Sequence, residues 1–281
     1  MTTPTGRPFA QVDVFVSGPL SGNPVAVVLD GAGLDDDTMA AFARWTNLSE
    51  TTFVLPPTDS AADYRLRIFT PGGELPFAGH PTLGSAHAWL GSGGMPAGDT
   101  IVQECGIGLV TIRRDGDRLA FAAPPLRRSG PVDDAVLAEI RDALGLTPSD
   151  VVASNWVDNG PGWIGLMLTS AQRVLDVRPD LAALGDREVG LIGAHRDGPD
   201  GVDYEVRAFA PGDGVPEDPV TGSLNAGFAV WLRSTGEVPA QYIAAQGTAL
   251  GRAGRVHVDD DGTHIWVGGA STTTISGTVD L

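Results

Sequence analysis

Lysine is absent from this sequence of 281 residues, and cysteine occurs only once, as Cys105. All 18 basic residues are therefore arginine. Without lysine, no Schiff base can form through a lysine side chain, and the lysine of a Walker A phosphate-binding loop is missing. Because Cys105 has no second cysteine to pair with, an internal disulfide, a cysteine-based zinc cluster and a racemase with two thiol bases are excluded.

Positive charge is also scarce, since 35 acidic residues outnumber the arginines and give a formal net charge of −17. Nucleic acids and anionic membranes would be repelled, so neither is expected as a partner. The five histidines show no metal-binding spacing, so no metal site is expected. We find neither a signal-peptide pattern nor an apolar run of membrane-spanning length, which predicts a cytoplasmic protein.

Hydrophobic residues make up 42 % of the chain, which suffices for one large domain or two modest ones. Periodicity and turn residues predict alternating strands and a few helices. Helices are expected at residues 35–46, 81–90, 132–144 and 220–233. Strands are expected at 9–16, 25–30, 51–57, 63–69, 100–105, 108–114, 118–123, 150–157, 162–168, 188–195, 202–209, 254–259, 263–268 and 272–280.

The two halves of the chain resemble each other. RIFTPG from Arg67 corresponds to RAFAPG from Arg207, and each segment leads through a Pro/Gly-rich loop into an apolar helix. Each of these helices carries almost no charge and must be buried nearly all round. We therefore predict an α+β fold of two pseudo-symmetric halves, each a mixed sheet wrapped around a central apolar helix, with a cleft between them.

The two loop-to-helix junctions are candidate sites for a carboxylate, because a helix start presents unpaired N–H groups. Gly79 and Gly222 would let the backbone approach a ligand, and Ser223 adds a hydroxyl group. His80 suits substrate binding and the satisfaction of a loop carbonyl equally well. Local rules favour a plain helix cap for Asp218.

Glu50 stands in NLSETTFVLPP, at the start of an apolar segment. A carboxylate beside apolar residues has its charged form disfavoured, and a raised pKa suits a general acid/base. Local context alone favours an exposed turn glutamate, and two loop carboxylates, Glu74 and Glu217, compete for the catalytic role.

Six motifs in order resemble those of the PhzF-like phenazine biosynthesis isomerase family. They are GNPVAVV at 22–28, NLSETTFV at 47–54, RIFTP with ELPFAGHPTLGSA at 67–86, RAFAPG with EDPVTGS at 207–223, QG at 246–247 and GR at 251–252. At Ala253 and Gly254 the chain departs from the more common GRPS pattern.

The resemblance implies a diaminopimelate-epimerase-like fold. The N-terminal half would comprise residues 1–127, completed by a last strand at about 271–281, and the C-terminal half residues 128–270. It further implies Glu50 as the acid/base, with His80, Asp218 and Ser223 in substrate binding. No metal or organic cofactor would take part, and the protein would be a homodimer.

These features predict a cofactor-independent isomerase that shifts a proton within a small carboxylate-bearing metabolite. Three alternatives stay open. The chain could isomerise another natural-product intermediate, such as an alkylproline-type precursor. It could be an epimerase or a dehydratase, although the missing thiols argue against both. It could also bind a small molecule without catalysis.

Overall fold

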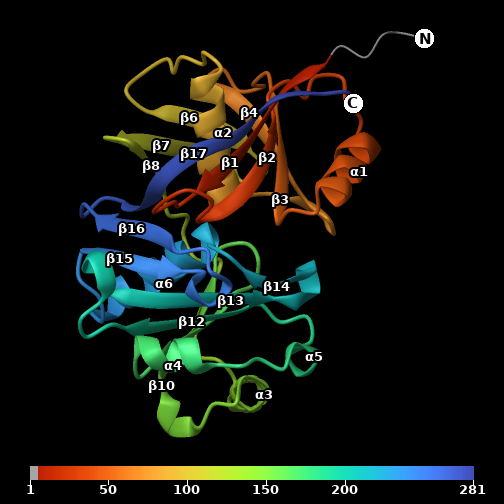
Figure 1. Cartoon of the computed structure of the whole chain (residues 1–281). Coiled ribbons are helices and arrows are strands. Elements are labelled where there is room, and N and C mark those ends of the chain that lie inside the picture. The colour runs from red at the N-terminus through yellow and green to blue at the C-terminus, as the bar shows by residue number, and fades with distance from the viewer. Residues whose placement is uncertain (1–5) are drawn as a thin grey trace. The chain divides into compact units, whose positions relative to one another are not determined.

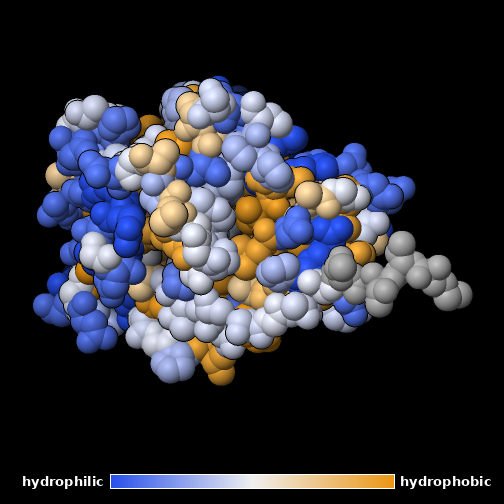
Figure 2. Space-filling view, turned by 90° about the horizontal axis from the view of Figure 1, so that it is seen from above, coloured by the Kyte–Doolittle hydropathy of each residue, from blue (hydrophilic) through white to orange (hydrophobic). Residues whose placement is uncertain are grey.

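The computed structural model describes residues 6–281, which divide into two compact units. Unit 1 holds the described residues up to Ala122 together with Gly268–Leu281, and unit 2 is Ala123–Val267. Among the described residues, no helix is long and apolar enough to span a membrane. The surface seen from above is mostly hydrophilic, with apolar areas between the polar side chains (Figure 2).

Unit 1 is a mixed sheet around one helix (Figure 1). Its elements are β1 (Arg7–Val14), β2 (Asn23–Val28), α1 (Asp36–Thr46), β3 (Glu50–Leu55), β4 (Tyr64–Thr70), β5 (Gly73–Leu75), α2 (Gly79–Gly91), β6 (Ile101–Cys105), β7 (Gly108–Asp115), β8 (Arg118–Ala122) and most of β17 (Ile265–Val279).

The sheet of unit 1 closes on itself. Strands pair in the order β17, β1, β2, β3, β4, β6, β7 and β8, and β8 pairs in turn with β17. The β2–β3 and β4–β6 pairs are parallel, whereas the other pairs with a described register are antiparallel. Helix α2 is buried along almost its whole length and contacts β1, β2, β3, β4 and β8, so it fills the interior of the sheet.

Unit 2 repeats this plan. Its elements are β9 (Arg128–Gly130), α3 (Asp134–Leu144), β10 (Val151–Asp158), β11 (Ile164–Leu168), α4 (Ala171–Asp176), α5 (Leu181–Leu184), β12 (Val189–Ala194), β13 (Tyr204–Ala210), β14 (Val215–Asp218), α6 (Gly222–Thr235), β15 (Gln241–Gln246) and β16 (Gly254–Asp260). The β11–β12 and β13–β15 pairs are parallel, as are their counterparts in unit 1.

The two central helices are held in the same way. In unit 1 the buried Gln103 of β6 donates to the Thr82 hydroxyl at the start of α2, with an N–O distance of 3.0 Å. In unit 2 Gln246 of β15 accepts from the Thr221 backbone N–H at 3.0 Å and donates to its hydroxyl at 2.9 Å. A buried glutamine from the neighbouring strand thus fixes each helix start, which confirms the predicted α+β plan of two similar halves.

Two strands show where the local predictions differ from the structure. The strand Gln241–Gln246 was not predicted, because QYIAAQ offers only a weak alternation. The segments predicted as separate strands at 263–268 and 272–280 form one strand, β17. The adjacent Gly268 and Gly269 do not break the strand, because Gly268 packs against the backbone of Leu119, where a Cβ would not fit.

Candidate functional site

Glu50 is the first residue of β3, and its carboxylate faces His80. The Oε2 atom of Glu50 lies 3.3 Å from Nε2 of His80. The Glu50 side chain is 13 % exposed, and that of His80 is 3 % exposed. Glu50 is therefore neither an exposed turn residue nor a fully buried core residue. It is a partly buried carboxylate next to the buried side chain of His80.

His80 occupies the second position of α2, directly after Gly79. Its Nδ1 atom lies 3.4 Å from Nδ2 of Asn23, the fully buried first residue of β2, and the imidazole also bonds to the backbone carbonyl of Pro24. Burial lowers the pKa of His80 to about 3, and the bond to Pro24 opposes this only in part. The imidazole is consequently neutral at neutral pH.

Asn23 is a member of this group that the sequence did not single out. The available signal was its place in GNPVAVV, one of the family-like motifs, at the start of an apolar strand. What brings it to His80 is the sheet, since β2 pairs with β3 so that Val25 lies opposite Glu50. Asn23, Glu50 and His80 thus meet where two parallel strands begin beside the start of α2.

The other predicted residues gather in unit 2 around the start of α6. Asp218, the last residue of β14, accepts a hydrogen bond from the Thr221 hydroxyl at 2.6 Å. The N-cap of α6 is Thr221, so Asp218 does not cap this helix, contrary to the local expectation. Ser223 Oγ accepts from Trp163 Nε1 at 3.1 Å, which leaves the serine proton to be donated elsewhere.

Neither central helix is capped by the side chain of its own N-cap residue. The N-cap residues, Ala78 in α2 and Thr221 in α6, make no side-chain capping bond, and neither first turn contains an acidic residue. Helix α1 on the surface shows the contrast, because Asp35 caps it and two acidic residues follow. The N–H groups of a helix start without an acidic residue in its first turn can attract an anion.

The two competing loop carboxylates are engaged elsewhere. Glu74 accepts two hydrogen bonds of 2.7 Å from Arg67, and Glu217 accepts two of 2.8 Å from Arg207. Arg207 also donates to the carbonyls of Val174 and Val177. These ion pairs fix the two loops, and Glu50 is the carboxylate left beside a neutral polar group.

The acid/base candidate has no counterpart in unit 2. Strand β12 corresponds to β3, because each pairs in parallel with the preceding strand, and β12 begins with the buried Val189. Among the described residues, no three His, Cys, Asp or Glu side chains are grouped as metal ligands. The similarity of the two halves is therefore one of scaffold, and the chemistry of their sites differs.

Comparison with known proteins agrees with this architecture. Residues 12–277 match the family described as phenazine biosynthesis-like protein. A trans-2,3-dihydro-3-hydroxyanthranilate isomerase of Pseudomonas aeruginosa is 35 % identical, with 90 % of each chain covered. Antisense-enhancing sequence 1 of Schizosaccharomyces pombe is 39 % identical, with 97 % of this chain and 98 % of that protein covered.

Solved structures give the same result. A predicted epimerase of Pseudomonas aeruginosa is 28 % identical with a TM-score of 0.79, covering 97 % of this chain and 99 % of that chain. A hydroxyproline epimerase of Agrobacterium vitis, with 16 % identity and a TM-score of 0.60, shares the fold and covers 100 % of this chain and 95 % of that one. The chain therefore belongs to the phenazine biosynthesis-like protein family and is an enzyme of its PhzF-like isomerase type.

Proposed function

We propose that the protein is a cofactor-independent isomerase that moves a proton between two carbons of a small unsaturated carboxylic acid, with Glu50 as the general acid/base. The observation that carries this proposal is the placement of the Glu50 carboxylate beside the neutral imidazole of His80. The isomerase names of several relatives support the reaction class, and their named substrate, a dihydro-hydroxyanthranilate, supports the substrate class.

The reaction needs one group that can take up and return a proton. In the proposed step the Glu50 carboxylate removes a proton from an sp³ carbon, and the C–H electron pair enters the adjacent π system. The electron density shifts along the conjugated carbons, and a new C–H bond forms at the far carbon with the proton that Glu50 returns. No electrons are gained or lost, so no redox partner is required.

The starts of α2 and α6, whose first turns contain no acidic residue, are the proposed sites for the substrate carboxylate and for the negative charge that develops on it. His80, Asp218 and Ser223 are proposed to hold its polar substituents, and Gly79 and Gly222 to admit its close approach to the backbone. We further expect the protein to be cytoplasmic and to form a homodimer. Size-exclusion chromatography with light scattering would test the dimer.

The position of solvent deuterium in the product tests this function. With trans-2,3-dihydro-3-hydroxyanthranilate in D₂O, we expect a label on a carbon that was sp² in the substrate, and hence a shifted double bond. A label at an unmoved stereocentre would indicate an epimerase instead. The same assay is run with a panel of unsaturated cyclic carboxylates that includes alkylproline-type precursors. If the protein binds these compounds without label uptake or turnover, the isomerase proposal is refuted in favour of a non-catalytic binder.

A further inference from the structure

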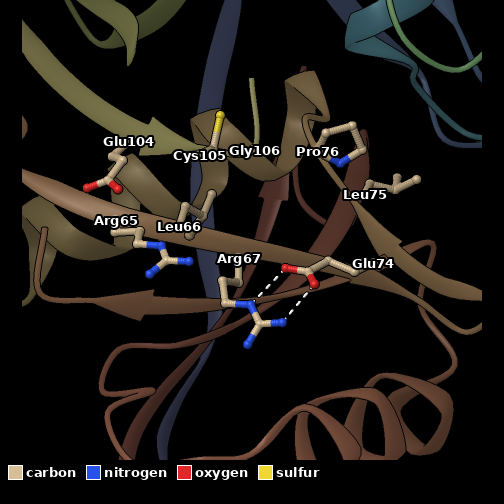
Figure 3. A pocket seen from close by; sticks show the side chains of 9 residues that line it. All are labelled: Arg65, Leu66, Arg67, Glu74, Leu75, Pro76, Glu104, Cys105 and Gly106. Atoms are coloured by element: carbon tan, nitrogen blue, oxygen red, sulfur yellow. Dashed lines mark hydrogen bonds and ion pairs between the residues drawn. The ribbon is translucent and has the colours of Figure 1, made fainter. Parts of the chain in front are cut away.

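A cavity of about 410 Å³ interrupts the sheet of unit 1 (Figure 3). Strand β3 covers one edge of β4, so β5 and β6 must share the other edge. Strand β6 pairs with Tyr64 and Arg65, and β5 pairs with residues 68–70. Leu66 and Arg67 lie between the two partners, and the cavity occupies this interval.

The charged groups of the cavity lie on the opposite face of the sheet from Glu50. Thr52 of β3 bonds to Ser85 of α2, so Thr52 and Glu50 face the interior. Ile68 lies opposite Thr52 and shares that face, which places Arg65 and Arg67 on the outer face. The cavity is therefore distinct from the proposed isomerase site in unit 1.

Three of the four charged side chains that line the cavity form hydrogen bonds with other groups of the protein. Arg67 donates to Glu74, as the dashed lines in Figure 3 show, and also to Asp36 at 2.7 Å. Glu104 accepts from the backbone N–H groups of Thr58 and Asp59 at 2.6 and 3.1 Å, and these bonds help to lower its pKa.

Arg65 is the exception. Its charge acts on Glu104 through space, but it forms no hydrogen bond or close ion pair with any residue in the described part of the chain. A guanidinium carries five N–H donors in a planar fork that matches carboxylate and phosphate oxygens. In a chain with a net charge of −17, a guanidinium that makes no hydrogen bond at a cavity wall is a local attraction for an anion.

We propose that this cavity is a second ligand site, which binds a small carboxylate or phosphate anion through Arg65. Its volume falls within the roughly 300–1,000 Å³ of small-molecule sites. Leu75 and Pro76 supply an apolar wall, so a ligand with a flat or aliphatic body beside its anionic group fits best. The site would act apart from the isomerase chemistry, as a place for an effector or a second metabolite.

Cys105 provides a specific reporter, because it is the only cysteine and lines the same cavity. The experiment follows alkylation of the intact protein by iodoacetamide, using mass spectrometry at one fixed, mildly alkaline pH. Burial raises the pKa of the Cys105 thiol, so the pH is held constant and each variant is compared with its own rate without added probe. Benzoate and inorganic phosphate are the anionic probes, and benzamide is the neutral match of benzoate.

We expect at least one of the two anions to slow alkylation in a saturable manner, and benzamide to leave the rate unchanged. A stronger effect of benzoate identifies a carboxylate site, and a stronger effect of phosphate a phosphate site. Arg65→Gln should lower the affinity for the protecting anion by about tenfold or more, since a charge-assisted hydrogen bond is lost. Arg65→Lys should have an intermediate effect.

Arg114→Gln is the matched control, because Arg114 is an exposed arginine of β7 in the same unit and does not line the cavity. It should leave the protection intact. Equal protection in Arg65→Gln, equal protection by benzamide, or no protection of the wild-type protein by either anion would each overturn the proposal.

Discussion

Oε2 of Glu50 lies 3.3 Å from Nε2 of His80, and the imidazole in this contact is neutral. Burial, which lowers the pKa of His80 to about 3, is the cause. A protonated histidine would neutralise the carboxylate as an ion pair, whereas a neutral imidazole leaves its charge uncancelled. The contact therefore suits a group that must both accept and return a proton.

Replacement of the acid/base should abolish most of the activity. Glu50→Gln keeps the side-chain shape and removes the basic oxygen, so we expect kcat to fall about 10²- to 10⁴-fold with an unchanged melting temperature. Turnover of the confirmed substrate and uptake of solvent deuterium measure the effect. Glu74→Gln is the control, because Glu74 is a rival carboxylate bound to Arg67, and its turnover should stay near that of the wild type.

Asn23 should act through His80 as a positioning residue. Asn23→Ala removes the side chain 3.4 Å from the imidazole, and we expect kcat to fall about tenfold or more with a smaller change in KM. The pH profile of kcat should shift as well, which a purely structural asparagine would not cause. Asn155→Ala, another buried asparagine, should lower stability and leave kcat and the profile unchanged. Equal kinetics for both variants would contradict the role of Asn23.

The buried His80 should make stability depend on pH. In the unfolded chain its pKa returns to the ordinary 6.5, so between pH 6.5 and 3 the unfolded state binds a proton that the folded state does not. The free energy of unfolding should therefore fall as the pH drops through this window, by up to about 1.4 kcal/mol per pH unit for this one group. Urea unfolding at several pH values measures the slope, which His80→Gln should reduce. An identical slope in the variant would refute this explanation.

The two equivalent arginines should differ in their contribution to stability. Arg207→Leu leaves Glu217, 13 % exposed, without its partner and also strips two carbonyls of their donor, so we expect a loss of about 3–5 kcal/mol. Arg67→Leu should cost about 1 kcal/mol, since its partners Glu74 and Asp36 are 42 % and 80 % exposed. Chemical denaturation compares them, and equal losses would be inconsistent with this ranking.

Helix α2 offers a test of packing with an internal control. A Cβ on Gly84 would lie 2.4 Å from Cγ1 of Val25 and 2.9 Å from Cγ2 of Val14. Gly84→Ala should therefore cost about 1–3 kcal/mol through overpacking. Gly91→Ala, at the end of the same helix, meets no atom within 4 Å and should be neutral or slightly stabilising. If Gly84→Ala left the free energy of unfolding unchanged, the strands around α2 would have to move apart to admit the extra methyl group, and the overpacking prediction would be wrong.

Much of the fold was predictable because its signals are local. Apolar helices without charge, such as residues 81–90, have to be buried, and the RIFTPG and RAFAPG segments mark equivalent strands of the two units. The course of β17 was less predictable, because its glycines indicate a break unless the close approach of Leu119 is known. The strand at 241–246 is stabilised by its pairing with β13 and β16 more than by its own pattern.

The sequence by itself determined which chemistry is available: no lysine, one cysteine, and a carboxylate at position 50 followed by an apolar strand. Tertiary structure decided how these groups are used. It placed His80 and Asn23 beside each other, engaged Glu74 and Glu217 with arginines, and left Arg65 at a cavity wall. The physical reason is that burial and contact set the charge state and the partners of a polar group, and both depend on residues distant in the chain.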